Sequence, residues 1–241
     1  MAPLDKTETA PTPGRSGFRP EQVRTACEKS LTRLGVDHLD MYLLHWPDDD
    51  IPVEDTWGAM RDLVDEDLVQ LAGLSNFDQE QIERCRAVGP VDVLQECLSL
   101  IDRLEHRELF QWCAERDIAV VTYEPLANGM LAGAIKAPED FARVVEDYAE
   151  WPFWQRLFSP GKFERSQAVV DGMRAMTDEV GCTLGQLALA WNIHQQGVTA
   201  TLAGSRNPLH VRENAEAASI ELTDAQLANL DALIPMGPAF A

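Results

Sequence analysis

Short apolar runs alternate with amphipathic segments along most of this 241-residue chain. Segments such as EDTWGAMRDLVDE and QEQIERCRAVG have the apolar spacing of helices. The runs between them are typical of parallel strands that helices cover on both faces. The pattern therefore predicts an α/β fold built from repeated strand–helix units. The five runs are LDMYLLH, LVQLAGLS, VDVLQECLS, IAVVTYE and VTATLAGS.

Each predicted strand leads to a polar or small residue. Because the carboxyl ends of parallel strands meet at one edge of a sheet, we expect these residues to form a site there. A buried histidine bonded to backbone, or ordinary hydrogen bonds at strand ends, is the alternative. The strand-end residues are His45, Ser75, Gln95, Tyr123 and Ser205.

Three segments fall outside the strand–helix pattern. Residues 1–17 are rich in Pro, Thr and Gly and predict a flexible arm ahead of a globular region over residues 18–241. Residues 134–163 predict an insertion with clustered aromatic residues, either a lid or a flap packed on its own Trp and Phe. Near the end, Thr223 and Gln226 have the spacing of a capping box and predict a helix start.

The charge is strongly acidic, with 40 Asp and Glu against 20 Lys and Arg. Phosphates would be repelled, so we expect no binding to nucleic acid or to an anionic membrane surface. No apolar stretch approaches the roughly 18 residues of a membrane span. Five scattered cysteines without CxxC spacing favour reduced thiols in the cytoplasm. Asp48, Asp49 and Asp50 are interpreted as a charged loop, and no metal site is predicted.

Several motifs in order resemble those of the aldo-keto reductases, from about Phe18 to Pro235. The resemblance implies a (β/α)8 TIM-type barrel that binds NADP(H) across its mouth and acts on a small-molecule carbonyl compound. The motifs are RLGVDHLDMYLLHWP, GLSNF, Gln95 followed by SLIDR, TYEPLANGMLAG and GSRNPLHVREN.

The resemblance also implies roles for the strand-end residues. His45 matches the active-site histidine that orients and polarises the substrate carbonyl. Ser75, Asn76 and Gln95 match the side chains that hold the nicotinamide carboxamide. Tyr123 matches the ring that stacks on the nicotinamide, although simple packing against the core is an equal alternative.

Two further groups match the rest of the cofactor site. The PLANG segment, with Leu126 and Asn128, matches the loop beneath the pyrophosphate. The adenosine end is matched in the GSRNPLHVREN motif, where a 2'-phosphate calls for a cation; a network at a helix start is the alternative. The residues matched at this end are Ser205, Arg206, His210, Glu213 and Asn214.

The chain departs from the family pattern ahead of His45. In the family a tyrosine proton donor, a lysine and an aspartate come from the first three βα units, and the sequence shows no counterpart. Losing that acid would remove much of the rate of ketone reduction, so redox activity is doubtful. Glu124, where a small or hydroxylic residue is usual, is the candidate replacement acid or base.

These departures predict an N-terminally truncated member, an incomplete (β/α)8 TIM-type barrel with about five parallel strands. Its open edge predicts a homo-oligomer that covers it. Three functions remain open: an NADP(H)-binding protein acting on a carbonyl compound, a non-redox dehydratase, lyase or cyclase that uses His45 and Glu124, or a non-catalytic module that senses the cofactor.

Overall fold

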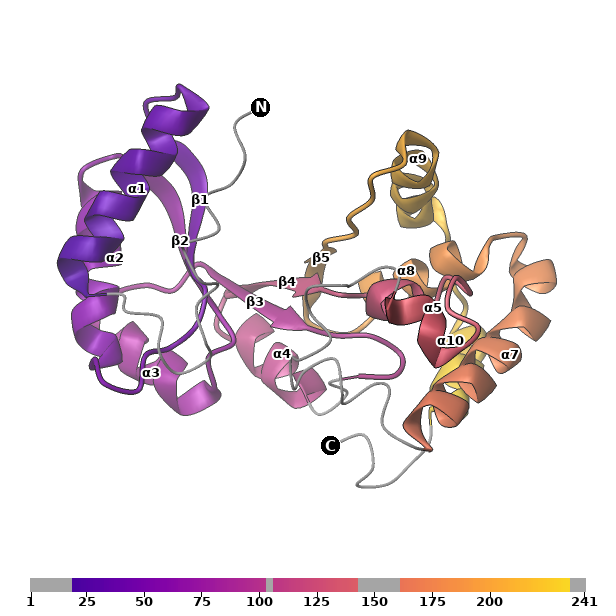
Figure 1. The fold of residues 1–241 in the computed structure, drawn as a ribbon. Coiled ribbons are helices and arrows are strands. Elements are labelled where there is room, and N and C mark those ends of the chain that lie inside the picture. Colours follow the sequence, from indigo (N-terminus) through magenta and orange to yellow (C-terminus); the bar gives the residue numbers. More distant parts are fainter. Residues whose placement is uncertain (1–18, 103–105, 143–160, 235–241) are drawn as a thin grey trace. The chain divides into compact units, whose positions relative to one another are not determined.

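A computed structural model of the chain describes residues 19–102, 106–142 and 161–234 (Figure 1). The arm predicted over residues 1–17 and most of the insertion predicted over 134–163 lie outside the described residues. The described elements are α1 (Pro20–Leu34), β1 (Leu39–Leu44), α2 (Val53–Asp65), β2 (Val69–Ser75), α3 (Gln79–Val88), β3 (Val93–Cys97), α4 (Arg107–Ala114), β4 (Ala119–Tyr123), α5 (Pro138–Ala142), α7 (Lys162–Val180), α8 (Leu184–Ile193), β5 (Val198–Thr201), α9 (Pro208–Glu216) and α10 (Asp224–Leu233).

The five strands form one sheet in the order β1-β2-β3-β4-β5. The pairs β1–β2, β2–β3 and β4–β5 are parallel, and Ser75 of β2 lies opposite Gln95 of β3. Parallel neighbours need crossover connections, and the helices between the strands supply them. The strand order leaves β1 and β5 as end strands, so the described strands do not close into a barrel. The predicted α/β fold with an incomplete barrel is confirmed.

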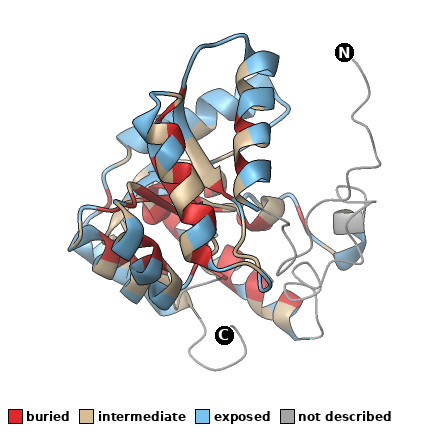
Figure 2. Ribbon diagram, turned by 90° about the vertical axis from the view of Figure 1, so that its left-hand side faces the viewer, coloured by how far each residue is buried: buried red, intermediate tan, exposed pale blue. Residues whose placement is uncertain are grey.

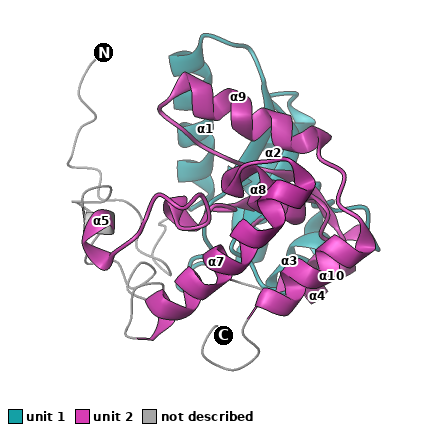
Figure 3. Ribbon diagram, turned by 90° about the vertical axis from the view of Figure 1, so that its right-hand side faces the viewer, with its two compact units in different colours: residues 1–95, 115–119 teal, residues 96–114, 120–241 magenta. Residues whose placement is uncertain are grey.

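The chain divides into two compact units, coloured separately in Figure 3. Unit 1 comprises residues 1–95 and 115–119, and unit 2 comprises residues 96–114 and 120–241. In unit 1, α2 packs against α1, α3 and β2. Trp57 of α2 is fully buried, and its Nε1–H donates to the carbonyl oxygen of Gly89 at 3.2 Å. Figure 2 shows how the outer faces of the helices stay exposed while buried residues line the faces turned to the strands.

The centre of unit 2 is α8, which packs against α7, α9 and β5. A helix that is apolar over most of its surface belongs in a core. One buried residue of the helix is polar: Asn192 donates from Nδ2 to the carbonyl oxygen of Leu98 at 2.7 Å, and its Oδ1 accepts from Thr122 Oγ1 at 2.6 Å. These bonds satisfy a buried amide and hold α8 against β4. The buried α8 residues are Leu184, Leu187, Ala188, Leu189, Ala190, Trp191 and Asn192.

The helix boundaries follow local signals in the sequence. Gly35, in the left-handed region at φ 69°, ends α1, and its backbone N–H donates to Leu31. At the start of α10 the backbone N–H of Gln226 donates to Thr223 Oγ1 at 3.2 Å, and Gln226 Oε1 accepts from the Thr223 backbone. The predicted capping box is therefore confirmed.

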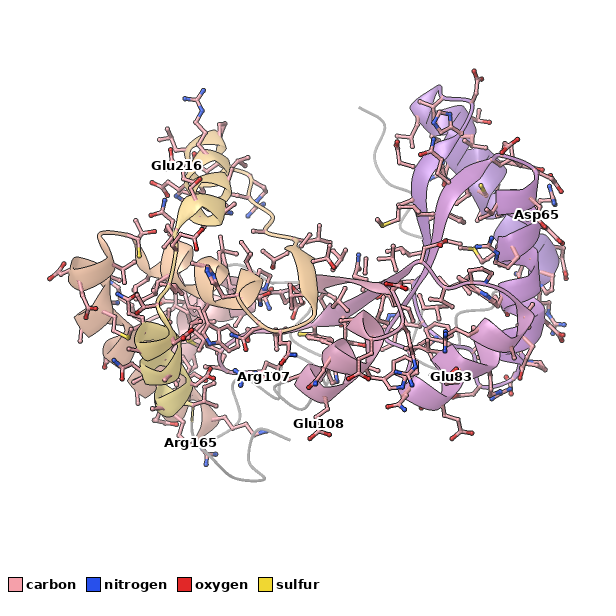
Figure 4. The ribbon with its side chains drawn as sticks, turned by 180° about the vertical axis from the view of Figure 1, so that it is seen from behind. Asp65, Glu83, Arg107, Glu108, Arg165 and Glu216 are labelled. Atoms are coloured by element: carbon pink, nitrogen blue, oxygen red, sulfur yellow. The ribbon has the colours of Figure 1, made fainter. Side chains whose placement is uncertain are left out.

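Acidic side chains are distributed over the outer faces of helices. In Figure 4 the labelled side chains of Asp65, Glu83 and Glu216 point away from the helices that carry them. Each of the five cysteines is a free thiol, as expected from their spacing. No helix in the described parts of the chain is long and apolar enough to cross a membrane.

Candidate active site

The first group of candidate residues lies at the carboxyl ends of β1 and β2, within unit 1. His45 directly follows β1, and Ser75 is the last residue of β2. Asn76 Nδ2 donates to the carbonyl oxygen of His45 at 2.9 Å and to Ser75 Oγ at 3.0 Å. The backbone N–H of Asn76 donates to the carbonyl oxygen of Gln95 at 3.2 Å. The structure therefore brings together all four residues predicted for this part of the site.

Asn76 is the residue that organises this group. Its φ of 64° lies in the left-handed region, which asparagine tolerates better than most side chains. Ser75 beside it is buried, with 1% of its surface exposed. Asn76 Nδ2 bonds to groups that follow β1 and end β2, so its amide has a defined direction. A defined amide direction is what recognition of another planar amide requires.

The imidazole of His45 is exposed but partly surrounded by protein atoms. This partial desolvation lowers the pKa of His45 below its ordinary value of 6.5. Trp46 is the nearest aromatic neighbour, with ring centroids 6.0 Å apart and planes tilted by 51°. Near neutral pH the ring is therefore neutral and has one N–H donor and one acceptor nitrogen.

None of the tyrosines whose surroundings the structure describes reaches His45 within unit 1. Tyr42 is turned toward α1, where it bonds to Ser30, and burial raises the pKa of its hydroxyl. Tyr123 belongs to unit 2, where it ends β4 and its carbonyl oxygen accepts from the backbone N–H of Leu98 at 3.3 Å. Tyr148 lies outside the described residues. Tyr42 is thus directed into the packing of unit 1 and does not serve as a proton donor beside His45.

The second group of candidate residues lines a pocket of about 770 Å³ within unit 2. Arg206, predicted for the same group, is exposed and does not line it. Ser205 was expected to end the fifth strand, but β5 ends at Thr201, so Ser205 lies in the loop before α9. The pocket residues that the sequence predicted are Glu124, Leu126, Asn128, Ser205, His210, Glu213 and Asn214.

The loop after β4 forms one wall of the pocket with a compact backbone. Glu124, Ala127 and Asn128 have φ values of 56°, 44° and 57°, in the left-handed region that favours glycine. Backbone bonds close the loop: Ala127 N–H donates to Glu124 at 2.9 Å, and Gly129 N–H donates to Leu126 at 3.0 Å. Several non-glycine residues with positive φ in one loop are characteristic of functional sites, where strain positions side chains.

The side-chain amide of Asn128 lies in the pocket wall with an unsatisfied hydrogen-bond donor. Its Nδ2 is buried, and within the described residues no atom accepts a hydrogen bond from it. An unsatisfied buried amide donor costs about 1–3 kcal/mol, so native proteins retain few of them. Because Asn128 lines the pocket, a ligand with an acceptor oxygen would remove that cost.

The comparison with known families shows which family the chain belongs to. A model described as the aldo/keto reductase family matches residues 5–235. The chain belongs to the aldo/keto reductase family. Membership in this family of oxidoreductases agrees with the α/β fold and its parallel strands.

Among solved structures, this family member is similar to a glycerol dehydrogenase from Gluconobacter oxydans, with 26% identity and a TM-score of 0.82 over 100% of this chain and 72% of that chain. A thermostable aldo-keto reductase bound to the inhibitor epalrestat has 25% identity and a TM-score of 0.70 over 90% and 67% of the two chains. An aldo-keto reductase from Bacillus halodurans in its holo form, with 21% identity, a TM-score of 0.72 and coverage of 90% and 68%, supports the fold alone.

In this aldo/keto reductase family member, the charges that line the unit 2 pocket differ from those of a simple phosphate-binding site. Two acidic residues, Glu124 and Glu213, line the pocket, and its described lining contains no Lys or Arg. Thr183 and Gly185, at the start of α8, also line it, so the positive end of a helix dipole faces the pocket. An anion here would be held by backbone and amide N–H groups, against the repulsion of two carboxylates.

Sequence reasoning missed pocket residues that carry no chemical signature. Thr183 has the sequence signal of a helix start, because Gln186 follows at capping-box spacing. That signal predicts a helix but gives no indication that its first turn faces loops far away in the chain. The residues missed are Ala132, Thr183, Gly185 and Gly204, among others.

Proposed function

We propose that this chain binds NADP(H), with the phosphate and adenosine part in the unit 2 pocket, and acts on a small-molecule carbonyl compound. The observation that carries the proposal is the buried, unpartnered amide of Asn128 in the pocket wall. The pocket volume of about 770 Å³ lies within the usual range for cofactor sites. The first turn of α8 adds backbone donors for an anionic group.

The family resemblance assigns roles that this proposal adopts. Leu126 and Asn128 contact the pyrophosphate, and residues of α9 and of the loop before it meet the adenosine end. When bound, the cofactor supplies a hydride to the carbonyl carbon. His45, neutral near pH 7, donates a hydrogen bond from its N–H to the carbonyl oxygen and orients it, and water supplies the proton that the reduced oxygen takes up. The adenosine-end residues are Ser205, Arg206, His210, Glu213 and Asn214.

The nicotinamide end follows the same assignment. Ser75, Asn76 and Gln95 hold the carboxamide, and Tyr123 stacks on the ring. The bonds of Asn76 to the His45 and Ser75 groups support a fixed direction for such recognition. A carboxamide offers both a donor and an acceptor, so the polar groups beside it must be matched in direction.

A fluorescence titration with NADPH tests cofactor binding. Asn128→Gly removes the amide while suiting the positive φ, and we expect NADPH to bind about tenfold more weakly, because a hydrogen bond to a charged acceptor is lost. Asp117→Gly is the matched control, since Asp117 has a φ of 58° in unit 1 and does not line the pocket. A wild-type chain that does not bind NADPH contradicts the proposal.

The redox step needs a separate assay. Oxidation of NADPH is followed with a panel of aldehydes and ketones, and His45→Ala is expected to lower kcat by at least tenfold while NADPH affinity stays within twofold. Binding without oxidation of NADPH by any of these compounds would favour a cofactor-sensing module over an enzyme.

A second candidate function is a non-redox reaction, such as that of a dehydratase, lyase or cyclase. The observation that favours it is the carboxylate of Glu124 in the pocket wall, on a backbone whose φ of 56° is rare for glutamate. Turnover of a substrate without any nicotinamide, abolished in Glu124→Gln, would establish this alternative.

A further inference from the structure

The helix α9 contributes to the wall of the unit 2 pocket, yet it has little packing of its own. It lies beside α8 within unit 2 (Figure 3). None of its nine residues is buried, and all but Asn214 are exposed. So short a helix is unstable in water by itself, so its position depends on the bonds that hold it to the rest of unit 2. The α9 residues that line the pocket are His210, Glu213 and Asn214.

The side chain of Gln186, on the first turn of α8, supplies such bonds. Its Nε2 donates to the carbonyl oxygen of Glu213 at 3.1 Å and to Glu216 Oε2 at 3.4 Å. Glu213 is among the last four residues of α9, whose carbonyl oxygens have no partner within the helix. Apart from the N-cap residue Asn207, no other side chain in the described parts of the chain forms a hydrogen bond with α9.

The same amide of Gln186 belongs to the capping box of α8. Its Oε1 accepts from the Thr183 backbone N–H at 3.0 Å, and the Gln186 backbone N–H donates to Thr183 Oγ1 at 3.2 Å. The two ends of the amide cannot be exchanged, because Nε2 would then face the Thr183 donor and Oε1 would face two acceptors. Gln186 therefore joins the start of α8 to the last turn of α9 in one orientation.

This link connects two walls of one pocket. Thr183 and Glu213 both line the unit 2 pocket, whereas Gln186 does not. Because α9 has no buried side chain, loss of the Gln186 bonds would leave it free to open locally. A ligand would then have to order α9 when it binds, and that ordering would lower its affinity.

We propose that Gln186 is a positioning residue for the adenosine end of the ligand. It holds α9 against α8, so that the residues of α9 form a pocket wall that is already in place before the ligand arrives. The inference rests on the proposed binding of NADP(H) in this pocket. Gln186 acts through Glu213 and Thr183, because it lies outside the pocket lining.

Gln186→Glu tests the proposal with a small change in shape. Glutamate keeps an acceptor for the Thr183 N–H and suits a capping box, but it replaces the Nε2 donor with an oxygen that repels the acceptors on α9. In the ligand-free chain, we expect the amides of residues 211–216 to exchange with solvent about tenfold faster. We expect NADPH to bind about tenfold more weakly in a fluorescence titration.

The chain offers a matched control at α10. Gln226 forms the same capping box with Thr223, and its Nε2 donates to Glu179 Oε1 at 2.9 Å. Neither Gln226 nor Glu179 lines the pocket. Gln226→Glu therefore makes the same changes in chemistry and total charge elsewhere in unit 2. Its NADPH affinity and its exchange in residues 211–216 should stay within about twofold of the wild-type chain.

A double variant separates the lost bond from a general loss of stability. Gln186→Glu combined with Glu216→Gln places the donor on α9 and the acceptor on α8, with the total charge of the wild-type chain. The reversed pair restores a bond between the two helices, so we expect at least about a threefold recovery of both slow exchange and NADPH affinity relative to Gln186→Glu. A role confined to the capping box would give no recovery.

Three results overturn the proposal: exchange in residues 211–216 that Gln186→Glu leaves unchanged, equal weakening of NADPH binding by Gln226→Glu, or a double variant without recovery. A wild-type chain that does not bind NADPH contradicts the proposed function instead. In that case the exchange of ligand-free α9 still measures whether Gln186 holds the helix, so the two failures are distinguishable.

Discussion

The side-chain amide of Asn76 joins the ends of two strands: its Nδ2 donates to the carbonyl oxygen of His45 at 2.9 Å. His45 follows β1 and Asn76 follows β2, so one hydrogen bond sets the relative position of two candidate site residues. The same nitrogen donates to Ser75 Oγ at 3.0 Å. Asn76 is therefore both a site residue and a structural link, and substitutions can separate these roles.

Replacing Asn76 with glycine or with alanine separates hydrogen bonding from backbone strain. Asn76→Gly loses the side-chain bonds but suits the φ of 64°, and we expect a loss of about 1 kcal/mol in the free energy of unfolding. Asn76→Ala loses the same bonds and adds left-handed strain, for a total loss of about 2 kcal/mol. Urea denaturation measures both. Equal stability of the two variants would show that the strain is absent.

Gly73 provides a test of packing within the sheet. A Cβ at this position would meet Leu43 Cδ2 and lie 2.6 Å from the carbonyl oxygen of Val93. We expect Gly73→Ala to lower the free energy of unfolding by about 1–3 kcal/mol, as overpacked cores do.

Gly58→Ala is the control for Gly73→Ala. Gly58 lies in the middle of α2, and a Cβ there meets nothing within 4 Å. Alanine is the better helix former, so this variant should gain about 0.5–1 kcal/mol. Thermal unfolding of both variants measures the difference, and a stabilised Gly73→Ala would contradict the close packing of β1, β2 and β3.

The strand-end site of unit 1 could be predicted from the sequence because chemistry and topology coincide there. Apolar runs of strand length end at His45 and Ser75, and parallel pairing brings such ends to one edge. The prediction failed for Ser205, although the run VTATLAGS continues to it. The last paired residue of β5, Thr201, lies opposite Thr122, one residue before β4 ends, so β5 stops within one residue of the end of its partner.

The unit 2 pocket could be predicted only in part. Glu124, Asn128 and Asn214 belong to recognisable motifs, but Thr183 and Gly185 line the pocket because α8 packs beside those motifs in space. No spacing in the sequence encodes that proximity. Nor does the sequence reveal that Arg206, the motif's cation, lies outside the pocket lining while Glu124 lies within it.

The carboxylate of Glu124 should weaken the binding of a phosphate-bearing cofactor. The described pocket lining contains two carboxylates and no Lys or Arg, so Glu124→Gln removes repulsion while keeping the side-chain shape. We expect the dissociation constant of NADPH to fall roughly three- to tenfold at low salt, and the gain to shrink as salt is added. Fluorescence titration at two ionic strengths measures it.

Glu221→Gln controls for the change in total charge. Glu221 is 95% exposed at its side chain and does not line the pocket, so the affinity for NADPH should change by less than twofold. If both variants tighten binding equally, net charge and not the position of Glu124 determines the effect.

The protonation of His45 gives a prediction about pH. Partial desolvation lowers the pKa of the His45 imidazole, so we expect its NMR resonances to titrate below pH 6.5, with His45→Gln identifying the signals. A titration midpoint at or above pH 6.5 would show that the ring is not desolvated. A neutral ring at pH 7 can donate a hydrogen bond to a carbonyl oxygen without carrying charge.

The same shift predicts a contribution of His45 to the pH dependence of stability. The unfolded chain binds a proton at this residue more readily than the folded chain, so the free energy of unfolding rises with pH between the lowered folded-state pKa and 6.5. The stability that His45 contributes is present above pH 6.5 and is lost as pH falls through the folded-state pKa. His45→Gln should therefore give a flatter dependence of the urea midpoint on pH below 6.5 than the wild-type chain, and the same dependence above it. A variant whose midpoint falls as steeply as that of the wild type would assign the acid sensitivity to other groups.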